Sequence, residues 1–201
     1  AEFFTRKKGQ KLAGKTLNKD FYGCATYGQR DNQYNWWLNR FASLGGLYFD
    51  DNMRPLINTD KGVKALENLK ATLKYSPPDV MNYGFDELQG VFLDGDAAMI
   101  INWTDPGRVG EDPRFSKVVG KIGTALVPGS KVGNKIVHKV SMAGGRVMAV
   151  TKWARDPERA YQVIRFMSHE ASLAYVSSPQ TGQDPFRFSH YESLGAFEMF
   201  S

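Results

Sequence analysis

The stretch that decides the fold is residues 92–103, which read FLDGDAAMIINW. It passes through a turn signal, Asp-Gly-Asp at 94–96, into a continuously apolar run at 97–101. A short apolar run bounded by a turn predicts a buried β-strand. An aromatic residue, Trp103, and an acid, Asp105, follow the strand in the next loop, so the sequence places a candidate binding loop directly after a core element.

Helical patterns flank this strand. Apolar residues at helical spacing predict helices over residues 32–44, 60–75 and 85–93, and a fourth begins after the N-cap Asp156 with Pro157 in its first turn. The predicted inward rows are Tyr34, Trp37, Leu38 and Phe41 in the first helix, Val63, Leu66, Leu69 and Leu73 in the second, and Ala160, Val163, Ile164 and Met167 in the last.

Further strands are predicted at residues 21–27, 121–127 and 146–151, and a short extended piece with a turn at 47–52. Short buried strands that alternate with helices indicate an α/β or α+β fold. Cys24, the single cysteine, lies in the first of these strands and is predicted to be a buried structural thiol.

Composition excludes several classes of protein. The chain has 201 residues, 42% hydrophobic and 23% charged, with a formal net charge of +5. These values are typical of a globular protein, and no apolar run reaches the roughly 20 residues of a membrane-spanning helix. One cysteine excludes an internal disulfide framework. The termini, Ala1 and Ser201, suggest a piece of a longer protein.

Signals for catalysis, metals or cofactors are missing. The three histidines are far apart in the sequence, and no GxSxG, HExxH or phosphate-loop motif is present. We therefore expect no cofactor, no metal and no enzymatic activity. The densest basic run, residues 6–11, can contact phosphates, but a solvated linker before the first strand is the favoured interpretation.

Trp103 and Asp105 form the first candidate site. Ligands of open α/β sheets bind outside the carboxyl ends of strands, where Trp103 can stack on an apolar face and Asp105 can accept hydrogen bonds from hydroxyls. A sugar or polyol has both features. An equally favoured alternative is that Trp103 merely closes the core.

Three other places add candidates. Trp36 is predicted to lie about 100° away from the core row of its helix, and Asn32 stands at that helix's N-terminus. Gly144 and Gly145 would let a ligand approach the backbone, although a plain turn is slightly favoured there.

Three segments in order, rather than any single motif, resemble the family 1 extracellular solute-binding proteins of bacterial ABC transporters, the maltose-binding-protein-like group. The segments are FASLGG at 41–46 with Phe49-Asp50, then residues 92–103, and then residues 143–150 with Asp156–Tyr161 and Phe166–Ser168. The resemblance spans about residues 20–188.

The resemblance implies a helix-rich lobe of a periplasmic-binding-protein-like type II fold. It divides the chain into an entry segment at 1–20, most of a C-terminal lobe at 21–188, and the start of a trailing helix at 189–201. It also implies ligand contacts by Trp103, Asp105, the Gly144-Gly145 loop, Trp36, Asn32 and, more weakly, Arg187.

The function implied by the resemblance is non-catalytic. A sugar, oligosaccharide or polyol would bind in an interlobe cleft and be delivered to the permease subunits of an ABC transporter. The protein would be periplasmic or extracellular, peripheral to the membrane through the permease, with no nucleic acid as partner. The alternatives are a nucleic-acid- or anion-binding module that uses the basic surface, and, third, a carbohydrate-active enzyme.

Overall fold

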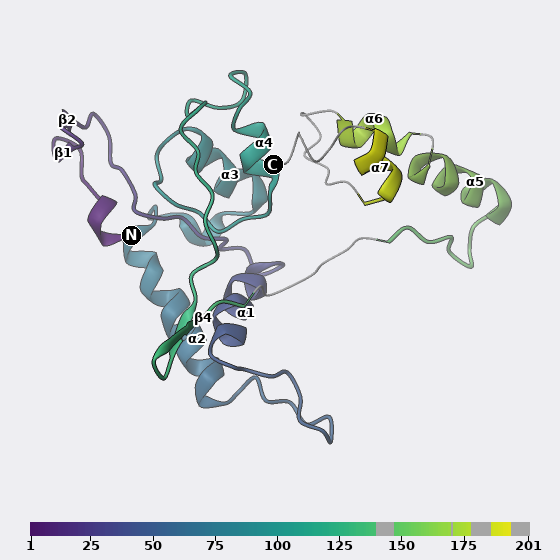
Figure 1. The fold of residues 1–201 in the computed structure, drawn as a ribbon, viewed down its shortest axis with the longest axis horizontal. Coiled ribbons are helices and arrows are strands. Elements are labelled where there is room, and N and C mark those ends of the chain that lie inside the picture. The colour runs from purple at the N-terminus through teal and green to yellow at the C-terminus, as the bar shows by residue number, and fades with distance from the viewer. Residues whose placement is uncertain (140–146, 170, 178–185, 194–201) are drawn as a thin grey trace.

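The computed structural model describes residues 1–139, 147–169, 171–177 and 186–193 (Figure 1). The helices are α1 (Gln33–Ser43), α2 (Asp60–Thr72), α3 (Phe85–Leu93), α4 (Asp105–Val109), α5 (Pro157–Ser168), α6 (Ser172–Ser177) and α7 (Phe188–Ser193), with 3₁₀ turns at Glu2–Phe4, Leu73–Tyr75 and Val80–Asn82. The strands form two antiparallel hairpins, β1 (Lys11–Leu12) with β2 (Lys15–Thr16), and β3 (Ser130–Val132) with β4 (Lys135–Val137). The sequence patterns predict helices α1, α2, α3 and α5 but not the shorter elements.

Two extended segments, residues 21–27 and 97–101, run side by side in parallel through the core. They meet in two isolated bridges, Tyr22 to Ala97 and Ala25 to Ile100. The backbone hydrogen bonds are Tyr22 N–H to the Asp96 carbonyl at 2.8 Å, Ala98 N–H to the Tyr22 carbonyl at 2.9 Å and Ala25 N–H to the Met99 carbonyl at 3.0 Å. The predicted extended segments are therefore confirmed, but as a short pair rather than as full strands.

The prediction that the second segment is buried throughout is wrong. Ala97 is buried, but 41% of Met99 is exposed. Ile100 and Ile101 are half-buried and pack against the same core. That core joins Ala25, Tyr27, Trp36, Leu69, Leu88 and Ala97.

Helix α1 forms as predicted and buries Leu38 and Phe41 as predicted, but the rest of its buried face differs from the predicted row. Tyr34 is 48% exposed, whereas Trp36, predicted to point away from the core, is 3% exposed. The Trp36 indole N–H donates to the Ile101 carbonyl at 2.8 Å. Burying this large ring with its N–H paired stabilises the helix against the extended pair, so Trp36 lies in the core and Trp37 is only half-buried.

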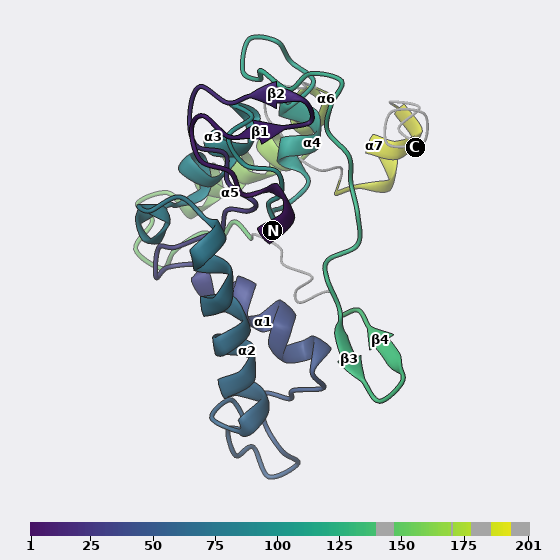
Figure 2. The same cartoon turned by 90° about the vertical axis from the view of Figure 1, so that its left-hand side faces the viewer.

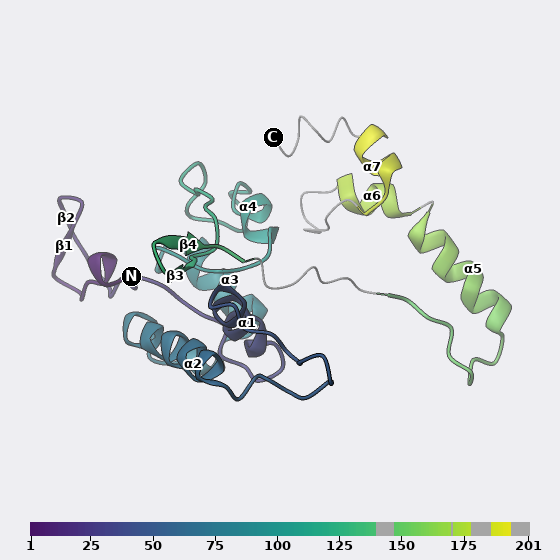
Figure 3. The same cartoon turned by 60° about the horizontal axis from the view of Figure 1, so that its bottom comes forward.

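Helix α2 packs along α1 (Figure 3), and Leu69 of its predicted inward row is buried as predicted, at 4% exposed. Gly62 and Ala65 are buried, whereas Val63 and Leu66 are 53% and 57% exposed, so their predicted inward position is wrong. Gly62 is confined by the turn before α2, because a Cβ there would lie 1.8 Å from the Ile57 carbonyl oxygen and 3.6 Å from the Trp37 ring of α1. The Trp37 indole N–H also donates to the Gly62 carbonyl, at 3.0 Å.

The predicted turn before the second extended segment is confirmed, because Gly95 has φ +73°, where glycine is favoured. The strands predicted at 121–127 and at the described part of 146–151 do not form. A strand requires a neighbour that pairs with its backbone, and in the described residues no strand pairs with either segment. Residues 47–52 do extend and turn, with a bridge from Phe49 to Pro55.

Cys24 is half-buried, rather than buried as predicted. Its Sγ lies 3.6 Å from both the Thr72 carbonyl oxygen and the Ser76 hydroxyl oxygen, so the thiol joins the first extended segment to the end of α2. In the part of the chain that the structure describes, no helix is long and apolar enough to cross a membrane.

Residues 1–20 form an arm built around the β1–β2 hairpin. An antiparallel bridge between Arg6 and Phe21 closes its base, and the Lys7–Asp20 ion pair spans the base at 2.8 Å. The arm lies at the outer edge of the molecule in Figures 1 and 3, and in front of the helices in Figure 2, where that side faces the viewer. The segment predicted to be a linker is therefore an ordered hairpin.

Helices α5, α6 and α7 lie at the opposite end of the molecule from the arm (Figure 1). The predicted cap of α5 is confirmed, because the Asp156 carboxylate accepts from the Arg159 N–H at 3.0 Å. The predicted inward row is wrong: α5 buries no residue, and Val163 and Met167 are 57% and 45% exposed. In the described part of the chain α5 makes only a small contact with α6, so nothing there covers its apolar face.

Candidate functional site

Four aromatic rings gather at the carboxyl ends of the two parallel segments. Trp36 stacks on Tyr27, with 4.8 Å between ring centroids, and meets Trp103 edge to face at 5.4 Å. Phe85, the first residue of α3, lies 6.0 Å from Trp103. Tyr27 and Trp36 are each 3% exposed and Trp103 is 45% exposed. Two buried rings therefore support one whose surface is open to solvent.

The backbone explains why these rings meet. The bridges between residues 22–25 and 97–100 fix the parallel register, so Tyr27 and Trp103 follow the same end of the pair. The Trp36 hydrogen bond to the Ile101 carbonyl ties α1 to that end. Ligands of open α/β sheets bind at such ends, and the predicted position of Trp103 beside a core element is thus observed.

Polar groups surround the cluster. The Tyr27 hydroxyl donates to the Asp31 carboxylate at 3.1 Å, and the Asn32 side-chain amide donates to the same carboxylate at 3.2 Å. Asn32 is the N-cap residue of α1, but its side chain makes no capping bond. Asp105 begins α4, two residues after Trp103, and is half-buried.

Burial raises the pKa of the Tyr27 hydroxyl. The hydrogen bond to Asp31 and the nearby Glu87 charge also raise this pKa, whereas Asn32 lowers it. Tyr27 is therefore a neutral donor over the physiological range. Its partner Asp31 is exposed and carries the charge of this network at its rim. The cluster is thus apolar in the middle and polar or acidic at its border.

Each of three aromatic residues in the cluster directly follows a polar residue with unsatisfied buried atoms. These are the Thr26 hydroxyl, both amide atoms of Asn35 and the Asn102 amide nitrogen, which have no hydrogen-bond partner in the described residues. The Asn102 amide oxygen, in contrast, accepts from the Trp103 N–H at 2.9 Å. Buried polar atoms are nearly always paired, and among these unpaired ones the Asn102 amide directly precedes the exposed Trp103.

Of the other predicted site residues that the structure describes, Arg187 is not joined to this cluster. Gly144 and Gly145 lie outside the described residues. Arg187 lies beside α7, where its guanidinium donates to the Ser168 carbonyl at the end of α5 at 2.6 Å. Trp36 belongs to the cluster, but as a buried support rather than as the exposed ring that the sequence predicts.

The comparison with known families assigns the chain. The sequence profile of the bacterial extracellular solute-binding proteins matches residues 6–172. The chain belongs to this family. Members are transport components rather than enzymes.

Two curated relatives of this solute-binding protein match over part of their length. A probable ABC transporter-binding protein of Deinococcus radiodurans is 27% identical over 66% of the chain and 30% of the relative. A probable amino-acid ABC transporter periplasmic-binding protein, y4oP of Sinorhizobium fredii, is 28% identical over 66% of the chain and 28% of the relative. The chain thus spans less than a third of these two relatives.

Solved structures show the fold of the solute-binding protein. Maltose-bound MalE3 of T. maritima has a TM-score of 0.69 at 21% identity, over 90% of the chain and 46% of that protein. A D-mannitol-bound ABC transporter solute-binding protein of Agrobacterium vitis has a TM-score of 0.66 at 21% identity, over 86% of the chain and 42% of that protein. The fold is the helix-rich α/β lobe of a periplasmic binding protein of type II.

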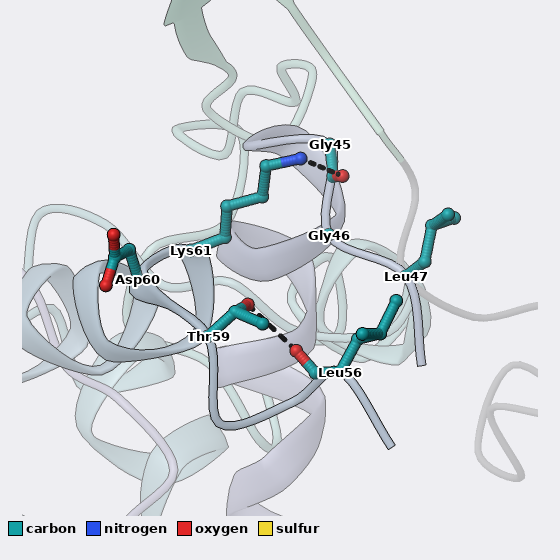
Figure 4. Close-up of a pocket in the computed structure, with 7 residues that line it drawn as sticks. All are labelled: Gly45, Gly46, Leu47, Leu56, Thr59, Asp60 and Lys61. Atoms are coloured by element: carbon teal, nitrogen blue, oxygen red, sulfur yellow. Dashed lines mark hydrogen bonds between the residues drawn. The ribbon is translucent and has the colours of Figure 1, made fainter. Parts of the chain in front are cut away.

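A pocket of about 300 Å³ lies elsewhere in the solute-binding protein, between the end of α1 and the start of α2 (Figure 4). Its polar groups serve the helix ends: the Lys61 ammonium donates to the Gly45 carbonyl and the Thr59 hydroxyl to the Leu56 carbonyl, both at 2.8 Å. Asp60 points away from the side where Leu47 and Leu56 lie. We therefore place the candidate site at the aromatic cluster.

Sequence reasoning missed Tyr27, Asp31 and Phe85. Tyr27 is the last residue of the first extended segment, and Trp103 comes directly after the second. Because the two segments pair in parallel, both residues lie at the same end of the pair, and this pairing is the signal that identifies Tyr27. Phe85 directly follows the buried Gly84 at the start of α3, and no periodicity marks it. In the described part of the chain, no three His, Cys, Asp or Glu side chains are grouped to hold a metal ion.

Proposed function

We propose that this solute-binding protein binds a sugar, oligosaccharide or polyol at the aromatic cluster, with Trp103 as the stacking surface. One observation carries the proposal: an indole that is 45% exposed rests against a buried Trp36 at the carboxyl ends of two parallel core segments. A ring fixed on its inner side loses little conformational freedom when a ligand stacks on its outer side.

The chemistry suits hydroxylated ligands. Sugars combine apolar C–H faces with polar edges, so they require a flat apolar surface bordered by hydrogen-bonding groups. Trp103 provides the surface. Asp105, Asn32 and the unsatisfied Asn102 amide provide acceptors and donors around it. Gly144, Gly145 and Arg187 remain predicted contributors to the same ligand.

The names of the compared proteins support this ligand class without deciding it. Two structural neighbours are described with maltose and D-mannitol, whereas one curated relative is described as an amino-acid transporter component. We infer that the protein serves an ABC transporter, outside the cytoplasmic membrane, and passes its ligand to the permease subunits. A peripheral position at the membrane follows from that contact.

The test is a titration of this chain with sugars, polyols and amino acids while the indole N–H signals of its four Trp residues are followed by NMR. We expect saturable shifts of the Trp103 and Trp36 signals with a neutral hydroxylated ligand. Trp103→Ala should weaken binding by about tenfold or more, because the stacking surface is lost.

Trp153→Ala is the matched control, since Trp153 is 79% exposed and lies outside the cluster. It should leave the affinity unchanged. Equal losses in both variants, or shifts with an amino acid alone, would contradict a hydroxylated ligand at Trp103. The absence of any shift, in a chain whose spectrum shows that it is folded, would contradict binding at this cluster.

A further inference from the structure

The positive charge of the molecule is concentrated in the arm. Residues 1–20 contain six Lys or Arg and two acidic residues, a formal charge of +4 out of +5 for the whole chain. The remaining 181 residues together are therefore nearly neutral. A field of this kind attracts anions to one place rather than to the surface in general.

The acidic groups near the arm hold it in position. Asp20 pairs with Lys7 and accepts from the Lys8 backbone N–H at 2.9 Å, and Asp96 pairs with Lys19. The hydrogen bonds from the Lys7 ammonium and the Lys8 backbone N–H lower the pKa of the Asp20 carboxyl. The Asp20 contacts close the arm on itself, and the Lys19–Asp96 pair joins it to the start of the second extended segment.

Three lysines of the arm are left facing solvent. Lys8, Lys11 and Lys15 are exposed and have no ion-pair partner in the described residues. The hairpin turns tightly through Ala13 and Gly14, whose φ values of +48° and +79° are typical of a two-residue turn with a fixed twist. The turn therefore places both lysines near the tip but on opposite faces of the hairpin, because Lys11 pairs with Thr16 and Lys15 pairs with Leu12.

The same arm also carries exposed aromatic rings, in the 3₁₀ turn Glu2–Phe4. Phe3 is 73% exposed and Phe4 is 37% exposed, and the Arg6 guanidinium lies 6.0 Å from the Phe3 ring centroid. Basic side chains next to exposed aromatic rings are typical of surfaces that bind at a lipid–water interface.

The arm and the candidate ligand site lie at opposite ends of the same parallel pair. The arm joins at Phe21 and Asp96, where the two segments begin, and the aromatic cluster lies where they end. Five residues of extended chain separate the two ends by about 17 Å. A partner on the arm therefore leaves the cluster open.

We propose that this arm binds the surface of an anionic phospholipid bilayer, with Lys8, Lys11 and Lys15 at the headgroups and Phe3 at the interface. An acidic protein segment would account for the lysines alone. A lipid surface accounts for both the lysines and the exposed Phe3 ring, so we favour it. Members of the family are extracellular, and the transporters they serve are embedded in a membrane. A lipid surface is therefore present where such a protein would work.

The experiment measures co-sedimentation of the full chain with vesicles of equimolar phosphatidylglycerol and phosphatidylcholine, and with vesicles of phosphatidylcholine alone. The triple variant K8Q/K11Q/K15Q should bind the anionic vesicles more weakly by about fivefold per lysine, on the order of 100-fold in all, at about 0.01 M salt. At about 1 M salt the wild type and the triple variant should bind the anionic vesicles with the same affinity, because salt screens the charges.

A matched control removes three lysines elsewhere: K64Q/K131Q/K135Q lowers the net charge equally, and two of its sites lie on the exposed β3–β4 hairpin. It should retain most of the binding. Equal losses in the two triple variants would overturn the proposal, because total charge would then explain the effect. Circular dichroism should show both variants folded, as all six side chains are exposed.

Two further measurements distinguish an anionic lipid surface from an acidic protein partner. Phe3→Ser should weaken the vesicle binding that persists at high salt, a result that an acidic protein partner does not predict. Binding to poly-glutamate with none to anionic vesicles would overturn the lipid assignment, as would equal binding to anionic and neutral vesicles.

Discussion

Helices α1 and α5 have similar amphipathic patterns, but only α1 buries its apolar face. Phe41 on α1 is 1% exposed, whereas Val163 and Phe166 on α5 are both 57% exposed. The difference lies in what faces them: α2 and the parallel segments cover α1, and in the described part of the chain nothing comparable covers α5. An apolar row shows that a helix can be buried, and the neighbouring elements decide whether it is.

The largest expected effect comes from the covered helix. Phe41→Ala should lower the free energy of unfolding by about 3–5 kcal/mol, because it leaves a cavity beside Leu38 and Ala65 and removes the stacking partner of Trp37. Urea denaturation followed by tryptophan fluorescence measures this loss. A loss below about 1 kcal/mol would show that the α1–α2 contact is not a packed core.

An intermediate effect is expected where α6 meets α7. His190 is 2% exposed, and its Nε2 lies 2.9 Å from the Ser172 hydroxyl oxygen, while its Nδ1 accepts from the Phe186 N–H at 3.4 Å. Burial, together with the nearby Arg187 charge, lowers the pKa of His190 below its usual value. The neutral ring is therefore the form that the fold prefers.

The contact between these helices should weaken as the pH falls through the unfolded-state value of about 6.5 towards the lower pKa of the folded state, and be at full strength above that range. Hydrogen exchange of the α7 amides between pH 7 and 5 measures it. His190→Gln should remove the pH dependence of this exchange. The same acid-induced loss in that variant would assign the effect to another group.

A smaller effect is expected at the start of α5. Asp156→Ala should cost about 1 kcal/mol of local helix stability, because the carboxylate no longer accepts from the Arg159 N–H. Amide exchange in the first turn of α5 measures the change. Asp156→Asn keeps an acceptor at the same position and should recover most of the protection.

The smallest effect is expected on the uncovered face. Val163→Ser should change the free energy of unfolding by less than about 0.5 kcal/mol, because a side chain that is 57% exposed gives up little burial. The same denaturation measurement as for Phe41→Ala serves here. A loss of 2 kcal/mol or more would mean that the face is covered in solution and would remove the contrast between α1 and α5.

Local signals predicted the elements that local chemistry determines. The Asp156 cap, the Gly95 turn and helices α1, α2, α3 and α5 follow from residues within a few positions of each other. Strand pairing and helix faces depend on partners far away in the sequence, and there the predictions were right only in part: Leu38, Phe41 and Leu69 are buried as predicted. Val63 and Leu66 were predicted inward because hydrophobicity was counted, whereas the buried face of α2 consists of Gly62, Ala65 and Leu69.

The candidate site was also predictable only where a local sequence signal marks a residue. Trp103 could be placed because it follows a recognisable apolar run. The role of Trp36 was predicted incorrectly, since the helical wheel does not show that its N–H reaches the Ile101 carbonyl. Tyr27 and Phe85 needed the parallel register and the position of α3, which no single segment contains.

The edge-to-face contact between Trp36 and Trp103 also has an optical consequence. Two indoles with 5.4 Å between ring centroids and 80° between ring planes are close enough for their electronic transitions to couple. Such a pair gives paired bands of opposite sign in circular dichroism, and their strength depends on the angle between the rings. The protein thus contains its own chromophore pair, whose signal would report any rotation of Trp103 without an added label.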